Sequence, residues 1–158
     1  MPTSSVPAAD RAARRAGWVL LGCAGMAACT ALFNPSSYSQ STAYNDDGRL
    51  RLEYSRLDRA GSPTRLRLWV APGQASDGRL RIRMNMAYTK VMRITRIHPE
   101  PERVETGLED IVFVFREKER RGPSLLEFDV MPIDLGRYDG RLAVVGDRSV
   151  EFTQYMMP

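Results

Sequence analysis

Cysteine is almost absent from this sequence. Cys23 and Cys29 both lie in one apolar segment near the N-terminus, and none follows them. A disulfide framework and a thiolate metal site are therefore excluded for residues 30–158. A region without thiols is indifferent to the redox state of its compartment, so export to an oxidising compartment is compatible with the sequence.

Histidine and lysine are scarce as well. His98 is the single histidine, and only Lys90 and Lys118 among the 23 basic residues are lysine, so the others are arginine. One histidine without companions at ligand spacing provides neither a metal site nor a nucleophile–histidine pair. No glycine-rich phosphate loop occurs. We therefore expect no cofactor, no bound metal and no catalytic residue.

Charge of one sign is also lacking. The formal net charge is +4, which is too weak to indicate a nucleic-acid partner. Carboxylates that could carry out acid–base chemistry gather in one proline-bearing stretch, which we interpret as a solvated loop. They are Glu100, Glu102, Glu105, Glu109 and Asp110.

Two methionines could indicate copper, because thioethers bind Cu(I). Met84 and Met86 are two residues apart, which places both side chains on one face of a strand. Met84 also continues the apolar face of Leu80 and Ile82. Core packing is therefore the simpler interpretation of these methionines.

One long apolar run is present. Residues 1–15 are polar and contain Arg11, Arg14 and Arg15, and Ala16–Phe33 then gives 18 residues without charge. This is the lower limit for crossing a hydrocarbon core of about 30 Å. Arginines before the run, and none directly after it, predict a single transmembrane helix with residues 1–15 in the cytoplasm.

Three other interpretations of this segment remain open. A cleaved signal peptide has the same layout, although no A-x-A site is well placed before Asn34. Leu20–Cys23 resembles a lipobox, which would give lipidation at Cys23, and Cys29 is a second candidate. The segment could also be an ordinary buried helix. A retained span and a lipid anchor both place the remainder of the chain outside the cytoplasm.

Beyond the span, residues 34–48 are polar and without periodicity, which predicts a linker. From residue 49 on, apolar and polar residues alternate with the period of β-strands. A short helical turn is expected at 85–90, and a charged loop at 117–123. Strands are expected at 49–54, 65–70, 79–84, 91–97, 111–115, 125–130, 142–145 and 150–155, with 111–115 a central strand buried on both faces.

These strands predict an all-β domain over residues 49–158. Each alternating strand buries one face, so two antiparallel sheets must pack their apolar faces together. An immunoglobulin-like β-sandwich of about eight strands is the expected fold, without the Cys…Trp…Cys pattern of antibody domains. A small barrel is the alternative.

The most informative polar feature is a predicted arginine-rich face. It lies on two runs that we expect to pair as a hairpin. Tryptophan and arginine dominate interface hot spots, so we expect this face to bind a partner or anionic lipid headgroups. Alternatively, arginine stems cover the tryptophan through cation–π packing. The residues of the face are Trp69, Arg65, Arg67, Arg79, Arg81 and Arg83.

Several short motifs in the domain resemble those of uncharacterised bacterial single-span proteins encoded alongside YetF-type membrane proteins. The resemblance covers most of the chain after residue 45 and implies an extracytoplasmic domain with a membrane-protein partner. It supplies no catalytic residue. The motifs lie in Leu52–Arg56, Ala60–Leu66, Ile94–Val104, Phe113–Phe115 and Phe152–Pro158.

These observations together predict a protein held in the inner (cytoplasmic) membrane by its N-terminal helix, with a periplasmic or extracellular β-domain. We expect an accessory subunit whose domain docks on an integral membrane protein. The alternative is an envelope protein that binds a small ligand or lipid. An apolar pocket between the sheets would favour the alternative, and a filled sandwich would favour docking. An enzyme would need loop carboxylates that are buried together with raised pKa values.

Overall fold

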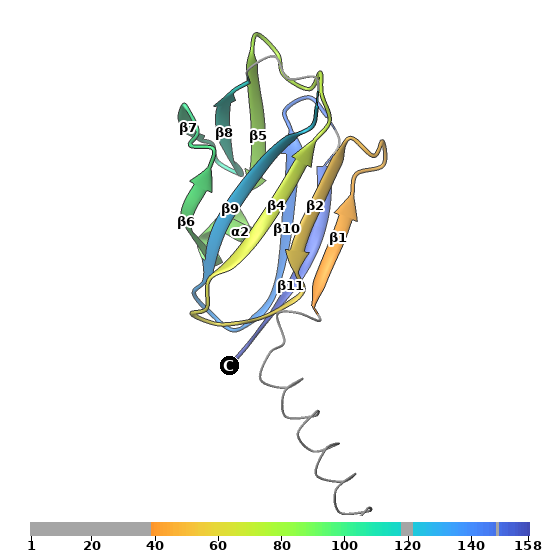
Figure 1. The fold of residues 1–158 in the computed structure, drawn as a ribbon. Helices are drawn as coiled ribbons and strands as arrows, with labels where there is room; N and C mark the ends of the chain where they lie inside the picture. The colour runs from red at the N-terminus through yellow and green to blue at the C-terminus, as the bar shows by residue number, and fades with distance from the viewer. Residues whose placement is uncertain (1–38, 118–121, 148) are drawn as a thin grey trace, which may run out of the picture. The chain divides into compact units, whose positions relative to one another are not determined.

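The computed structural model describes residues 39–117, 122–147 and 149–158. They form two β-sheets that face each other, and one short helix (Figure 1). No helix within these residues has the length and hydropathy needed to cross a membrane. The span expected at residues 16–33 lies outside the described residues.

The first sheet, sheet A, has five strands in the order β1-β2-β4-β9-β6, and all its neighbours are antiparallel. The second, sheet B, has six strands in the order β3-β11-β10-β5-β8-β7. The strands of sheet A are β1 (Gln40–Tyr44), β2 (Leu50–Ser55), β4 (Thr64–Val70), β9 (Ser124–Pro132) and β6 (Met92–His98). Those of sheet B are β3 (Leu57–Arg59), β11 (Ser149–Met157), β10 (Gly136–Val144), β5 (Arg79–Asn85), β8 (Asp110–Arg116) and β7 (Arg103–Thr106).

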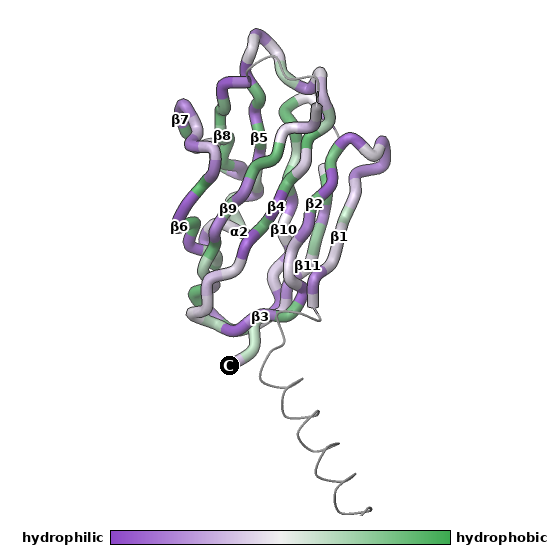
Figure 2. Tube along the Cα trace, in the orientation of Figure 1, coloured by the Kyte–Doolittle hydropathy of each residue, from purple (hydrophilic) through white to green (hydrophobic). Residues whose placement is uncertain are grey.

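The core is the layer between the two sheets. Along β4 and β5 every second side chain is buried, and Figure 2 shows this alternation of apolar and polar residues. Leu68 of sheet A and Ile82 and Met84 of sheet B are fully inaccessible to solvent. The all-β architecture of two facing sheets is thus confirmed, and Met84 packs in the core. The closer assignment to immunoglobulin-like sandwiches stays a prediction.

Three strands were not expected from the sequence. Residues 34–48 were expected to be a linker, but Gln40–Tyr44 forms the edge strand β1. The stretch expected as a carboxylate-bearing loop contains β7, which pairs with β8. β3 pairs with β11 in parallel, so the sheets are not wholly antiparallel. All three are edge strands with little or no buried face, so they lack the alternation that reveals a strand.

The helical turn expected at 85–90 is the helix α2 (Met86–Val91). It follows β5 directly and places Tyr88 in the core, where the ring is 1% exposed. At its start the side-chain oxygen of Asn85 accepts a hydrogen bond from the backbone N–H of Arg141, at 2.8 Å. Asn85 therefore continues the pairing of β5 with β10 while the backbone leaves the sheet.

The apolar run 111–115 is not central. It lies in β8, between β5 and the edge strand β7. Phe113, Val114 and Phe115 are nevertheless buried. Val114 stands opposite Arg81 on one side and Arg103 on the other, so the stems of these arginines can cover it on the outer face. Burial on both faces therefore holds for residues 113–115, whereas Ile111 and Val112 are only partly buried.

Gly140 offers a direct test of the packing. A Cβ at this position would lie 2.2 Å from the Phe152 ring, with which Gly140 is paired across β10 and β11. We expect Gly140→Ala to lower the free energy of unfolding by about 1–3 kcal/mol, the usual cost of overpacking a core. Urea denaturation followed by circular dichroism measures the change.

Gly122→Ala is the control, since no atom lies within 4 Å of a Cβ at Gly122. Replacing Phe152 with leucine in the Gly140→Ala background is expected to recover part of the loss. An unfolding midpoint for Gly140→Ala equal to that of Gly122→Ala would contradict this packing.

Candidate functional site

The six residues of the predicted arginine-rich face do not share one face. β4 belongs to sheet A and β5 to sheet B, so the expected hairpin between them is wrong. Residues 71–78 connect the two strands and contain both Pro72-Gly73 and Asp77-Gly78. Two successive turns let the chain cross to the other sheet, whereas a tight hairpin would need a single short turn.

As a result, the outer face of sheet A carries three of the six residues, and the outer face of sheet B carries the other three. The residues on sheet A are Arg65, Arg67 and Trp69, and those on sheet B are Arg79, Arg81 and Arg83.

On sheet A, each arginine of β4 stands opposite a carboxylate of β9. The Arg65 Nε lies 2.6 Å from the Asp129 Oδ1, and the Arg67 Nε lies 2.9 Å from the Glu127 Oε1. The register places these residues directly across from one another. Cross-strand pairs of opposite charge stabilise a sheet modestly, and they also remove the repulsion that neighbouring arginines would create.

Trp69 continues this face toward the other end of β4. The Arg51 guanidinium carbon lies 4.9 Å from the centre of the Trp69 ring, within cation–π range. The register extends this row across four strands: Tyr44 is opposite Arg51, and Leu125 is opposite Trp69. We call Tyr44, Arg51, Trp69 and Leu125 the aromatic row.

The aromatic row is the most apolar part of this face. Tyr44 is 61% exposed and Leu125 is 39% exposed, while Trp69 is half-buried beneath Arg51. The sequence predicted Trp69 on the outer face of its strand but did not show that Arg51 covers it. Tyr44 was missed because it lies in the expected linker. The sequence also gives no sign that β1 pairs with β2 and so places Tyr44 opposite Arg51.

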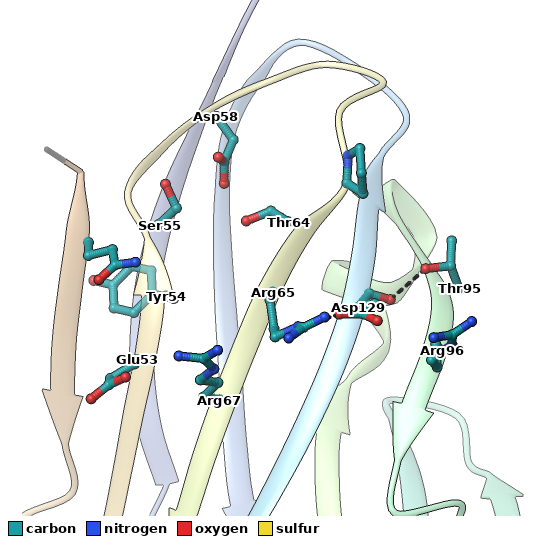
Figure 3. A pocket seen from close by; sticks show the side chains of 12 residues that line it. Glu53, Tyr54, Ser55, Asp58, Thr64, Arg65, Arg67, Thr95, Arg96 and Asp129 are labelled. Atoms are coloured by element: carbon teal, nitrogen blue, oxygen red, sulfur yellow. Dashed lines mark hydrogen bonds and ion pairs between the residues drawn. The ribbon is translucent and has the colours of Figure 1, made fainter. Parts of the chain in front are cut away.

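At the other end of the face, β2 and β4 separate. Their pairing stops at Glu53 and Arg67. Beyond this point β2 stays paired on its other edge with β1, where Ser55 is opposite Gln40. The gap forms a groove of about 630 Å³ on the outer face, which we call the notch (Figure 3). The notch is lined by residues including Gln40, Tyr54, Ser55, Asp58, Thr64, Arg65 and Arg96.

Asp58 is the unusual residue of the notch. Burial raises the pKa of its carboxyl, and hydrogen bonds from the Thr64 and Ser55 side chains partly oppose that rise. Among the described residues, its Oδ2 has no hydrogen-bond partner. This oxygen is itself shielded from solvent, and a buried oxygen without a partner is costly when charged, which agrees with the raised pKa.

Behind Asp58 lies a buried polar pair. The Tyr88 hydroxyl donates to the Gln154 Oε1 at 2.5 Å, and the Gln154 Nε2 donates to the Ser55 carbonyl at 2.8 Å. Burial and the charge of Asp58 raise the pKa of Tyr88, so its hydroxyl stays protonated as a donor. Sequence reasoning missed these residues because they come from four separate elements.

On sheet B, Arg79 and Arg83 are paired with carboxylates that the sequence placed in a loop. Glu102 accepts from Arg116 at 2.9 Å and from Arg79 at 3.3 Å, and the hydrogen bond from Arg116 is the main reason that its pKa is lowered. Asp110 lies 3.5 Å from Arg83. Arg81 makes no ion pair within the described part of the chain.

The remaining candidate groups are dispersed. His98 is exposed on β6 and stands opposite Glu127. Within residues 39–117, 122–147 and 149–158, no three histidine, cysteine, aspartate or glutamate side chains are placed to hold a metal ion. Among the carboxylates of residues 100–110, Glu102 forms ion pairs with Arg79 and Arg116, and Asp110 forms one with Arg83. The others are exposed.

Comparison with known proteins gives only a likeness in fold. No family model and no curated protein matches the chain. Among solved structures, it is similar to a cohesin module from a family 33 glycoside hydrolase of Clostridium perfringens, with 8% identity and a TM-score of 0.45. That match covers 73% of this chain and 97% of the module.

A second likeness is to a type I cohesin–dockerin complex from Clostridium thermocellum. Here the identity is 10% and the TM-score 0.36, over 64% of this chain and 83% of the other. At such low identities and TM-scores, neither likeness carries an inference about what this chain does.

Asp58 gives a testable pH dependence. Its raised pKa means that the folded state holds this proton more tightly than the unfolded chain. Wild-type stability is therefore lost as the pH rises from the ordinary value of 3.8 through the raised folded value. We expect Asp58→Asn to be more stable than wild type at pH 7, with the difference shrinking toward zero below pH 3.8.

Urea denaturation of wild type and Asp58→Asn at each pH gives the difference between their unfolding midpoints. The other carboxylates are the same in both proteins, so their contributions cancel in this difference. Asp134→Asn, in the exposed turn before β10, is the matched control and is expected to leave the midpoint unchanged. A difference between wild type and Asp58→Asn that does not vary with pH would contradict the assignment.

Proposed function

We propose that this protein is a membrane-anchored, non-catalytic interaction subunit. Residues 16–33 remain in the cytoplasmic membrane with residues 1–15 inside, and the β-domain lies on the periplasmic or extracellular side. The outer face of sheet A docks on an integral membrane protein. The resemblance to single-span proteins encoded alongside YetF-type proteins supports that class of partner.

The observation that carries the proposal is the aromatic row on the outer face of sheet A. Exposed Tyr44 and Leu125 flank a tryptophan that an arginine already covers. Tyrosine, tryptophan and arginine are enriched among residues whose removal costs most binding energy. The charged rows beside it are already neutralised internally by Glu127 and Asp129, so they can form a polar rim without uncompensated charge.

The interior of the sandwich supports docking over the alternative of a small-ligand protein. A hollow of about 450 Å³ opens beside His98 and Ser124, but its floor is closed by Leu80, Phe115 and Leu126. These three side chains are each at most 2% exposed. An apolar ligand would therefore have to displace packed core residues to enter, which is unfavourable in a close-packed interior.

We expect Trp69→Ala combined with Arg67→Glu to abolish capture of the partner. The substitutions remove the largest ring of the aromatic row and place a negative charge beside Glu127 and Glu53. Affinity purification of the full chain in mild detergent, quantified by mass spectrometry against wild type, measures capture. Circular dichroism of the variant checks that the domain still folds.

Arg81→Glu is the matched control, since Arg81 lies on the outer face of sheet B. It is expected to retain the partners that wild type recovers. Recovery of the same partners at the same yield by the sheet A double variant would overturn the proposed docking face.

A further inference from the structure

One end of the sandwich combines exposed apolar side chains with exposed cations. We call it the basal end. It consists of the β2–β4 connection, the turn between β9 and β10, and the last residues of β11, which Figure 1 shows together with the start of β1. The junction of α2 and β6, with Lys90 and Arg93, belongs to it as well, because the Ile133 N–H donates to the Val91 carbonyl at 2.9 Å. Backbone hydrogen bonds join these segments: Ala60 donates to the Met157 carbonyl at 2.9 Å, and Gly61 donates to the Pro132 carbonyl at 3.1 Å.

Half of the large apolar residues that are exposed in the described structure gather at the basal end. The most exposed is Leu135, at 55%, and the set includes one tyrosine, which favours the boundary between hydrocarbon and water. The five residues are Leu57, Ile133, Leu135, Tyr155 and Met157.

The cations of the basal end differ from those elsewhere on the domain. Arg56, Arg59, Lys90 and Arg93 are all exposed, and none makes an ion pair within the described residues. On the sheet faces, by contrast, most arginines are matched with a carboxylate, as Arg65 is with Asp129. The exposed carboxylate of Asp134 offsets one of these four charges, so the basal end keeps a net positive charge that can meet an anionic surface.

The described chain also begins at this end. The Ser39 hydroxyl donates to the Leu57 carbonyl at 3.0 Å, and the Arg56 N–H donates to the Ser39 carbonyl at 2.8 Å. Phe33, the last residue of the uncharged segment, is only six residues before Ser39. Covalent geometry limits that connection to about 20 Å when fully extended.

From these observations we propose that the basal end lies against the headgroups of anionic lipids. The proposal rests on the proposed function only for the membrane anchor, because the anchor brings Ser39 close to the bilayer. The lipid phosphates are bound by four cations, Arg56, Arg59, Lys90 and Arg93. Leu57 and Leu135 enter the boundary between the headgroups and the hydrocarbon core of the bilayer. This surface is distinct from the aromatic row, so one domain contacts lipid at its end and protein on its face.

Hydrogen exchange of the full chain in nanodiscs tests the proposal. In discs that contain phosphatidylglycerol, we expect the amides of 56–61 and 133–136 to exchange more slowly than in discs of phosphatidylcholine alone. Arg56→Glu combined with Arg59→Glu is expected to reduce this protection by about 30-fold, since two cations contribute about 1 kcal/mol each near an anionic surface.

The matched control is Arg49→Glu combined with Arg81→Glu, which makes the same change of charge away from the basal end, at arginines that form no ion pair with a described residue. This variant is expected to keep full protection. For the apolar contribution, Leu135→Ser is expected to weaken protection, whereas Leu108→Ser, at a fully exposed turn between β7 and β8, is not.

Equal exchange in the two kinds of disc, or equal effects of the two double variants, would overturn the proposal. Protection that appears only when an integral membrane protein is added would assign the basal end to a protein partner, and would also overturn the proposal.

A chain that fails to enter the discs would contradict the proposed membrane anchor. In that case exchange with added phosphatidylglycerol vesicles measures the basal end directly, and unchanged exchange would overturn the lipid contact.

Discussion

The burial of one side of each sheet against the other is the constraint on which this structure depends. Because side chains alternate along a strand, burying Leu66, Leu68 and Val70 forces Arg65, Arg67 and Trp69 outward. The outward arginines then need carboxylates at matching positions of neighbouring strands, which Glu127 and Asp129 supply. The interior therefore determines the pattern of charge outside, and with it the surfaces available for binding.

The same logic explains how much could be predicted from the sequence. Strands with a buried side, such as β4, β5 and β9, reveal themselves by their alternation, and α2 is short but recognisable. Edge strands such as β1 do not, because neither side is deeply buried. Sequence periodicity also carries no information on which strand pairs with which, so the expected hairpin of β4 and β5 was wrong. For the candidate site, Trp69, Arg65 and Arg67 could be placed on one face, whereas Tyr44 and the notch around Asp58 depend on tertiary pairing.

The proposed roles of the domain follow from its separate surfaces. The core side chains between the sheets are buried, and the outer face of sheet A offers an aromatic row beside neutralised charge. The basal end has a different character, because its cations form no ion pair in the described part of the chain and lie among exposed apolar side chains. A domain arranged in this way can rest on lipid while it presents a sheet face to a neighbouring protein.

The central claim is that the outer face of sheet A contacts an integral membrane protein. Its most direct measurement is photo-crosslinking in intact cells, with a benzophenone amino acid placed at Tyr44 in one strain and at Arg81 in another. We expect a crosslink to an integral membrane protein from position 44 and none to that protein from position 81. Crosslinks of equal strength from both positions, or a crosslink from position 44 to a cytosolic protein, would contradict it.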